Sequence, residues 1–406
     1  MKKLFFLFLV ANCILPTANC FSQNACTQMS GLPAEGRHGA AAFSIGSRAY
    51  FGTGHNNGGN VDVLFDDWWE FDPGTNSWTQ KANFGPGPRK WSHGFSIGNF
   101  GYICSGEEYN QVEMDDLWEY SPITNTWTQK ATFLGGVREG CASFTIGNKA
   151  YFGTGDWWFD MWEYDQATDS WSQIADYPNF SGQICCVGFN IGNKGYMGTG
   201  ADGNFVPTNE WFEYNPTTNV WTQKANVPGP LRSGACGFGI GNKGYIAVGT
   251  DWPNSMTCYS DCYQFTPATN SWMRIQDFPG SARRFVSYCN TINRGYMCTG
   301  TNGINLADMW EFNPALATGI NDNTPLEMNY SIFPNPFHES ATLQLLANPN
   351  SELTFELFDI QGKKVQILSI TQQTSTISRS NLPSGIYFYQ LTSANKKIRS
   401  GKLIIE

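Results

Sequence analysis

Arginine recurs at corresponding points along most of this chain and is the clearest candidate for binding chemistry. Five of the six corresponding points carry arginine and the remaining one carries glutamine. The residues are Arg37, Arg89, Arg138, Arg232 and Arg283, with Gln183 as the exception. Five guanidinium groups gathered around one axis would form a site for an anion, because each presents a planar fork of donors.

A recurring carboxylate supports a different interpretation of the same arginines. It stands two residues before an aromatic position in each repeat, as Asp67, Asp116, Asp160, Glu210, Asp261 and Asp308. A guanidinium suits a bidentate carboxylate partner, and pairing would relieve the repulsion among crowded cations. The sequence therefore favours structural pairing, and ligand binding by part of the arginine set is the alternative.

Less regular residues occupy the variable segments between the repeated motifs. They combine aromatic rings with acids and a histidine: His55, Glu107, Glu108, Tyr109, Trp157, Trp158, Asp202 and Trp252. Aromatic planes stack on the C–H faces of sugars while acids and amides bond to hydroxyl groups. These segments predict a binding face for a glycan or a protein; exposed loop residues without a role are the alternative.

Catalytic and metal chemistry find little support in the residue types. The three histidines of the repeated region, His38, His55 and His93, show no ligand spacing, and no motif singles out an acid or a base. We expect no catalytic residue, no metal and no cofactor. A formal net charge of −9 also argues against a nucleic-acid partner, which would require a basic face.

The repeat that positions these residues has a period of about 44 to 52 residues and is set by tryptophan. The tryptophans are Trp78, Trp127, Trp171, Trp221 and Trp272. Each unit offers an inner strand, a Gly-Asn turn, a second strand ending near Gly-Thr-Gly, a variable loop, a third strand, and the strand that bears tryptophan. One four-stranded unit cannot bury both faces alone, so the repeat predicts an all-β propeller.

One repeat is split between distant parts of the chain. Residues 25–37 match the tail of a unit, with Cys26 in the tryptophan position, whereas Asp308–Pro314 ends a unit whose last strand never follows. A split unit implies a closed ring in which residues 24–36 complete the last blade. The predicted propeller spans 24–314 and has six blades. Its loops between second and third strands, and its blade junctions, should open on one face.

The repeated glycine strand end followed by spaced Tyr and Trp resembles the Kelch repeat family, with Gly-Thr-Gly in place of adjacent glycines. The resemblance implies a six-bladed Kelch-like β-propeller. Sialic-acid epimerases built on this plan imply an alternative function as a carbohydrate-active enzyme, with Glu107 or Glu108 as the base. A non-enzymatic module that binds an extracellular glycan or protein remains the preferred interpretation.

The last 80 or so residues follow different patterns, which predict a small C-terminal β-sandwich over 329–406 after a linker at 315–328. Ile332–Pro336, Leu357–Gly362, Leu382–Tyr387 and Lys402–Ile404 resemble, in order, the C-terminal sorting domain of type IX secretion in Bacteroidota. The resemblance implies that the type IX secretion machinery is a partner and that the protein is secreted or held on the outer cell surface.

The N-terminus also predicts export. Two lysines precede an apolar run that is too short to span a bilayer, as in a signal peptide over 1–22. Lipidation of Cys20 is a less favoured alternative, because Thr17–Asn19 is a poor context for it. Export permits disulfides, and Cys258 with Cys262 is the pair we expect to join.

Overall fold

The computed structural model describes residues 24–59, 62–178, 181–317, 330–345, 353–393 and 396–406. The predicted signal peptide, the alternative lipidation site at Cys20 and most of the predicted linker lie outside these residues. The chain divides into two compact units, Met1–Ile320 and Asn321–Glu406.

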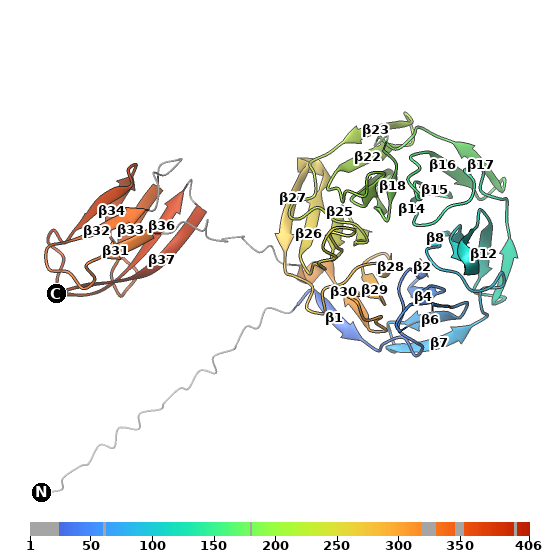
Figure 1. The fold of residues 1–406 in the computed structure, drawn as a ribbon, viewed down its shortest axis with the longest axis horizontal. Helices are drawn as coiled ribbons and strands as arrows, with labels where there is room; N and C mark the ends of the chain where they lie inside the picture. The colour runs from blue at the N-terminus through green and yellow to red at the C-terminus, as the bar shows by residue number, and fades with distance from the viewer. Residues whose placement is uncertain (1–23, 60–61, 179–180, 318–329, 346–352, 394–395) are drawn as a thin grey trace, which may run out of the picture. The chain divides into compact units, whose positions relative to one another are not determined.

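The first unit is a ring of six four-stranded antiparallel sheets (Figure 1). Blade 1 contains β2 (Ala41–Ile45), β3 (Arg48–Gly52), β6 (Trp68–Asp72) and β7 (Ser77–Lys81). Blade 2 contains β8 (His93–Ile97), β9 (Phe100–Cys104), β12 (Leu117–Ser121) and β13 (Thr126–Gln129). Blade 3 contains β14 (Ala142–Ile146), β15 (Lys149–Gly153), β16 (Met161–Asp165) and β17 (Ser170–Gln173).

The remaining blades repeat this order from the axis outward. Blade 4 contains β19 (Val187–Ile191), β20 (Lys194–Gly198), β22 (Trp211–Asn215) and β23 (Val220–Gln223). Blade 5 contains β24 (Cys236–Ile240), β25 (Lys243–Ala247), β26 (Cys262–Thr266) and β27 (Ser271–Ile275). Blade 6 contains β28 (Ser287–Asn290), β29 (Gly295–Cys298), β30 (Met309–Phe312) and β1 (Cys26–Met29).

The ring closes between the two ends of this unit. β1 pairs antiparallel with β30, so that Gln28 lies opposite Trp310 and Cys26 opposite Phe312. Figure 1 shows β1, at the blue end of the colour scale, beside the orange β30. The split repeat predicts this arrangement, in which the earliest strand supplies the outer edge of the last blade.

Short elements connect the blade strands. Three two-stranded sheets extend the blades: β4 (His55–Asn56) with β5 (Val63–Leu64), β10 (Glu107–Glu108) with β11 (Val112–Glu113), and β18 (Gln183–Ile184) with β21 (Ala201–Asp202). Single 3-10 turns occupy η1 (Tyr109–Gln111), η2 (Pro267–Thr269) and η3 (Pro314–Leu316). Among the described residues no helix is long and apolar enough to span a bilayer.

Inner strands pack closely because glycine in one blade faces phenylalanine from the blade before it. A Cβ at Gly101 would lie 2.1 Å from the ring of Phe43, and one at Gly195 would lie 2.1 Å from the ring of Phe144. Any larger residue would push the blades apart, so these glycines set the spacing between neighbouring sheets.

The outer edges are joined by a repeated clamp between neighbouring blades. At the junction of blades 3 and 4, Asn219 Oδ1 accepts from the amide of Ala175 at 2.8 Å, and Trp221 Nε1 donates to the carbonyl of Ala175 at 2.9 Å. The equivalent tryptophans Trp78, Trp127, Trp171 and Trp272 make the same bond. The tryptophans therefore hold neighbouring blades together.

The clamp changes where the ring closes. Cys26 holds the tryptophan position and has no indole N–H to donate, and Asn24 Oδ1 accepts from the Cys26 amide within its own strand. Only a long bond of 3.4 Å, from the Ala25 amide to Gln276 Oε1, crosses to blade 5 at the corresponding place.

All ten cysteines within the described residues are free thiols, so the expected Cys258–Cys262 disulfide is wrong. Cys262 lies inside strand β26 and is buried, whereas Cys258 precedes the strand and lies near the carbonyl oxygen of Thr301, at 3.9 Å from its Sγ. The two thiols therefore belong to different environments.

The second unit is a small sandwich of two antiparallel sheets. One sheet contains β31 (Tyr330–Phe333), β32 (Ser340–Leu345) and β35 (Thr374–Ser378). The other contains β33 (Leu353–Phe358), β34 (Lys364–Ile370), β36 (Gly385–Ser393) and β37 (Lys396–Ile405). Alternating apolar side chains, including Leu343, Phe355 and Leu403, fill the space between the sheets.

Candidate functional site

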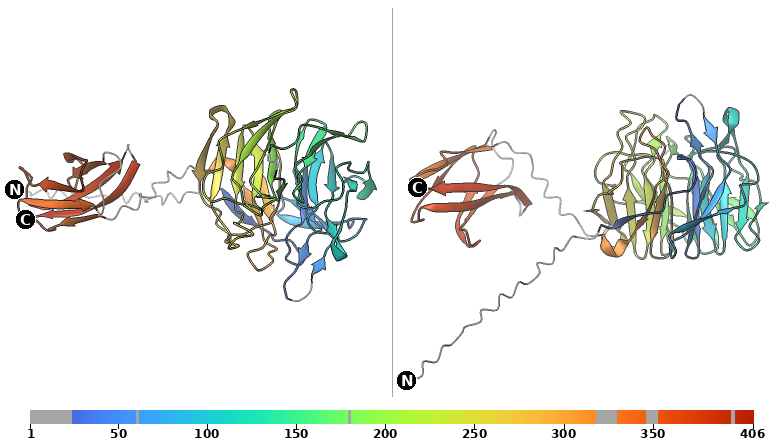
Figure 2. Two further views of the ribbon diagram at one scale, coloured as in Figure 1. Left: turned by 45° about the horizontal axis from the view of Figure 1, so that its top comes forward. Right: turned by 90° about the horizontal axis from the view of Figure 1, so that it is seen from below.

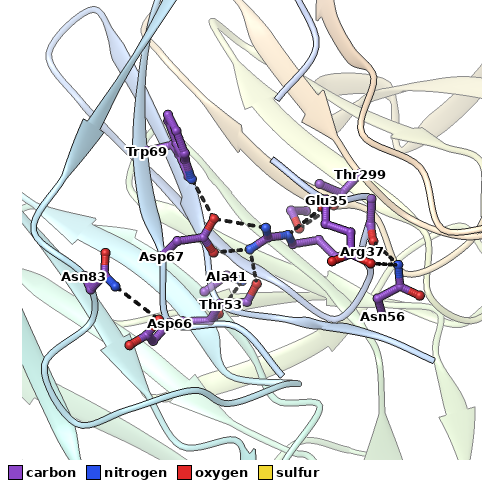
Figure 3. Close-up of polar contacts among 12 residues, drawn as sticks. Glu35, Arg37, Ala41, Thr53, Asn56, Asp66, Asp67, Trp69, Asn83 and Thr299 are labelled. Atoms are coloured by element: carbon purple, nitrogen blue, oxygen red, sulfur yellow. Dashed lines mark hydrogen bonds and ion pairs between the residues drawn. The ribbon is translucent and has the colours of Figure 1, made fainter. Parts of the chain in front are cut away.

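The recurring arginines form buried ion pairs on one side of the ring. Arg37 is 1% exposed, and its guanidinium makes a bidentate pair with Asp67 and donates to the carbonyl of Thr53 at 3.1 Å (Figure 3). Its Nε donates to the carbonyl of Glu35 at 3.0 Å. Trp69 Nε1 donates to Asp67 Oδ2 at 2.7 Å, so the carboxylate is held from both sides.

The same geometry recurs in four more blades. The bidentate pairs are Arg89 with Asp116, Arg138 with Asp160, Arg232 with Asp261, and Arg283 with Asp308. In blade 4, Gln183 Nε2 donates instead to the carbonyl of Thr199 at 2.5 Å and to Thr208 Oγ1 at 2.9 Å.

The five guanidinium groups are therefore committed to internal partners. All five arginines are 0 to 2% exposed. The geometry favours the structural interpretation of these residues over an anion-binding ring, because their terminal nitrogens, Nη1 and Nη2, already bond to carboxylates and backbone carbonyls.

A second ring of residues, two positions after each arginine, surrounds the axis on the same face. It consists of Gly39, Trp91, Gly140, Cys185, Gly234 and Phe285, all with φ between 55° and 65°. From Trp91 to Phe285, each member donates its backbone N–H to the carbonyl oxygen of the member before it. The bonds from Trp91 to Gly39 and from Phe285 to Gly234 are both 2.8 Å long. The rings of Trp91 and Phe285 lie over Gly39 and Gly234, where a Cβ would contact them at 3.0 and 2.5 Å.

This ring narrows the axial channel. A cavity of about 80 Å³ lies at the ring, and a larger one of about 210 Å³ lies among the inner strands. His93 and Tyr288 line both cavities, whereas no carboxylate or arginine lines either. Burial lowers the pKa of His93 to about 4, so this histidine is neutral near pH 7. Among the described residues, neither cavity brings an acid and an arginine together.

Aromatic side chains form a continuous row across the loop-bearing face, which we call the aromatic belt. It runs from Trp157 to Phe205 (4.5 Å between ring centroids), Trp252 (6.3 Å), Phe285 (6.1 Å) and Trp91 (4.7 Å). Blades 2 to 6 each supply one member. Sequence reasoning found Trp157 and Trp252 but missed the other three, although Trp91 and Phe285 replace the glycine found at that position in three blades.

Two histidines join the belt at blade 1. His38 and His55 lie 4.1 Å apart between ring centroids, and both rings lie within 5.6 Å of Trp91. Burial and the neighbouring His55 lower the pKa of His38 to about 3. Burial also lowers the pKa of His55, against the opposing effect of Asp62, whose Oδ1 lies 2.7 Å from Nδ1. Both rings are thus neutral near pH 7.

Four carboxyl groups crowd together beside the belt, and we call them the acidic arc: Glu107, Glu113, Glu139 and Asp156. Glu107 lies opposite Glu113 in the β10–β11 hairpin, a like-charge pair that destabilises a ladder. Asp156 Oδ2 accepts from the amide of Glu139 at 2.5 Å. Lys90 Nζ lies 3.2 Å from Glu107 Oε1 and 3.1 Å from Asp62 Oδ2, so one ammonium group serves two carboxylates.

Crowding changes the protonation of the acidic arc. Burial and the negative charge of Glu107 raise the pKa of Glu139 to about 9, and burial raises the pKa of Asp156 to about 6. Glu139 Oε2 is buried without a hydrogen-bond partner among the described residues. Glu139 therefore keeps its proton at neutral pH beside Glu107. No group of described residues has the arrangement needed to hold a metal ion.

The loops that join second and third strands add exposed apolar side chains in every blade, which we call the apolar rim. Its members are Val63, Tyr109, Val112, Trp158, Phe205, Val206, Met256 and Ile304, which are 37 to 72% exposed. Figure 2 shows the ring from the side, with the loop-bearing face and the opposite face at its two edges. On the opposite face, Ile123 and Ile292 are the only large apolar residues that the turns expose, among the residues that the structure describes.

Other predicted site residues have structural partners. Glu108 Oε1 lies 3.3 Å from Arg89 Nη2, and Tyr109 Oη accepts from the amide of Leu64 at 3.1 Å. Asp202 Oδ1 accepts from two amides of its own loop, Asn204 and Val206. The structure thus brings together His55, Glu107, Trp157 and Trp252, whereas the arginines lie beneath them in the scaffold.

The fold defines a six-bladed β-propeller and a separate small β-sandwich. Residues 331–406 match the family described as the secretion system C-terminal sorting domain. This is a type IX sorting domain, which directs the protein through the periplasm to the cell surface or into the medium, and it makes the secretion machinery a partner.

The propeller is similar to solved structures. One, titled "Structure of YjhT", is 18% identical with a TM-score of 0.59, and the match covers 73% of this chain and 98% of that chain. At this identity the likeness shows the fold alone. The search of curated proteins found no match.

Proposed function

We propose that the protein is a Kelch-type binding module, without enzymatic activity, that holds an extracellular glycan or protein on its loop-bearing face after type IX secretion. The proposal includes a signal peptide at 1–22, a propeller over 24–314 completed by residues 24–36, a linker at 315–328 and a sorting domain at 329–406. The aromatic belt is the observation that carries it.

The belt supports binding because its rings come from separate blades yet lie in contact on one face. Core aromatics would pack between sheets, whereas Phe205 of the belt is 50% exposed and Trp158 of the apolar rim is 53% exposed. Exposed apolar patches of this kind mark recognition surfaces. Polar groups at His55, Glu107 and Asp202 would orient a ligand beside the rings, and the exposed Tyr109 would extend the surface formed by Trp252 and its neighbours.

The test is binding of the mature full chain to a glycan array and to extracellular proteins by pull-down. Trp157→Ala and Trp158→Ala should each weaken binding of the captured glycan or protein about tenfold, because an aromatic contact contributes roughly 1 to 2 kcal/mol to the free energy of binding. Ile123→Ser, on the opposite face, is the matched control and should bind normally. Capture that survives both tryptophan changes but fails in the control would place binding elsewhere and overturn the proposal.

A carbohydrate-active enzyme, such as a sialic-acid epimerase-like propeller, is the second candidate. The observation that favours it is the contact between Glu107 and Glu139, whose pKa burial and Glu107 raise to about 9, since two neighbouring carboxyl groups suit proton transfer. Commitment of the five arginines to aspartates removes the expected partners of a sugar carboxylate. Turnover of free sialic acid that is lost in Glu107→Gln would support the enzyme, and an inactive wild-type chain would exclude this activity.

A further inference from the structure

The ligand of the loop-bearing face can be narrowed by its charge and by the kind of apolar surface that surrounds it. We propose that the acidic arc and the apolar rim form a docking surface for a polypeptide segment that carries arginine or lysine next to apolar side chains. This inference rests on the proposed binding function and names its ligand class.

Charged side chains are unevenly distributed around the axis on the loop-bearing face. The residue that directly follows each junction arginine pairs with a residue of the loop between the second and third strands. In blades 1 to 3 both members of the pair are titratable: His38 with His55, Lys90 with Glu107, and Glu139 with Asp156. The same positions in blades 4 to 6 carry Ile184 with Ala201, Ser233 with Thr250, and Arg284 with Thr301. At these positions carboxylates therefore occur in blades 2 and 3 and not in blades 4 to 6.

The acidic arc has fewer cationic side chains beside it than it has carboxyl groups. Lys90 is shared between Glu107 and Asp62, and the nearby Arg138 is engaged by Asp160. The like-charge pair of Glu107 and Glu113 and the unpartnered Glu139 Oε2 both cost stability. A guanidinium or ammonium group from a partner would relieve both, and it would take the place of the proton that Glu139 now holds.

The side chains of the apolar rim suit a polypeptide better than a glycan. A sugar needs flat aromatic planes, but the apolar rim also exposes Val112, Val206, Met256 and Ile304. Aliphatic and Met side chains exposed together with aromatics are typical of protein interfaces. The belt lies beside the acidic arc, where Trp157 directly follows Asp156, so an arginine could contact a carboxylate and an aromatic face together.

The experiment measures binding of the mature full chain to randomised peptides of about twelve residues, which span roughly 40 Å when extended. One library contains Arg, Lys, Leu, Phe and Gly; the matched library contains Glu in place of Arg and Lys. Oligosaccharides of neutral sugars and of glucosamine form a third set. Binding to the basic library, weakened by added salt, is the expected result.

Variants then locate the contact. The double change Glu107→Gln with Glu139→Gln should weaken binding of basic peptides about tenfold or more, because it removes carboxylates that face the ligand charge. Asp165→Asn removes one negative charge from the opposite face and should leave affinity within about twofold. Thermal unfolding of each variant checks that the fold is kept.

The outcomes separate this inference from the proposed function. Equal binding of both peptide libraries, or indifference to the glutamine changes, would overturn the basic-segment inference. Oligosaccharide binding alone, lost in Trp158→Ala, would also overturn it while leaving the proposed function in place. Absence of binding by every probe, or binding that no loop-face change affects, would overturn both.

Discussion

Arginine at the blade junctions stabilises the propeller because each guanidinium meets a carboxylate, a backbone carbonyl and an aromatic ring at once. Arg232 pairs with Asp261, donates to the carbonyl of Val248 at 2.9 Å and lies 5.3 Å from the ring centroid of Tyr263. Such a pair is costly to break, because the remaining charge stays buried without its partner.

We predict that Arg232→Ala lowers the free energy of unfolding by about 3 to 5 kcal/mol, because it leaves Asp261 buried and uncompensated. Arg294→Ala breaks a partly exposed pair with Glu311 and should cost no more than about 1 kcal/mol. Urea unfolding of both variants measures the difference. Equal losses in the two would contradict the structural role of the junction arginine.

The acidic arc makes stability depend on pH in a predictable direction. The folded state binds the Glu139 proton more tightly than the unfolded chain, because burial and Glu107 raise its pKa from 4.5 to about 9. Stability linked to this proton is complete below the unfolded pKa and is lost as pH rises towards 9. Asp156, raised from 3.8 to about 6, adds to the decline at the acid end of this window.

Glu139→Gln should therefore stabilise the protein at pH 8 by on the order of 1 kcal/mol and flatten the decline between pH 5 and 9. Glutamine keeps the shape of the neutral acid and cannot ionise beside Glu107. Urea midpoints across this pH range provide the measurement. A variant whose midpoints follow those of the wild type at every pH would show that Glu139 does not titrate as described.

At the scale of elements, the outer strands are not equally secured. Five of them carry the clamp in which tryptophan and a turn residue hold the preceding blade, whereas β1 carries Cys26. The loss of these two bonds coincides with the point of ring closure. We expect the seam to be where the ring opens first.

Hydrogen exchange tests this expectation on the native protein. Amides of β1 and their partners on β30 should exchange faster than those of the other outer strands, β7, β13, β17, β23 and β27, because local opening there costs less free energy. Cys26→Trp, which restores the residue of the other blades, should slow exchange at β1 if the seam admits the larger ring. Slower exchange at β1 than at β13 in the wild type would contradict the prediction.

At the scale of the whole molecule, folding and delivery belong to separate units. The core residues of the sandwich, such as Phe355 and Leu403, form a cluster of their own, as do those of the blades. A chain ending at residue 320 should keep the propeller fold and accumulate in the periplasm, because it lacks the matched sorting domain.

Cell fractionation and thermal unfolding of the truncated and full chains provide the check. Removal of the sorting domain should change the free energy of unfolding of the propeller by less than about 1 kcal/mol, because it takes no strand from the ring. Truncated protein on the cell surface would contradict the assignment of export to residues 331–406. Loss of the propeller transition would contradict the independence of the two units.

Much of the fold could be predicted from the sequence because it depends on local spacing. Glycine at Gly147 and Gly192 adopts the positive φ of a two-residue turn, at 60° in both, and the tryptophan period counts the blades. The aromatic belt could not be predicted in full. Phe205 and Phe285 look like ordinary apolar residues until the ring places each of them beside Trp252.

The sequence by itself determined the number of blades, the closure between β1 and β30, and the export address, because repeats and motifs are written in order along the chain. Only the tertiary structure decided which charged residues are available. Arginine and aspartate pair internally at the junctions, while Glu107, Glu113, Glu139 and Asp156 meet from different loops with one shared lysine. Burial and electrostatic crowding depend on distances in space, which no single repeat contains.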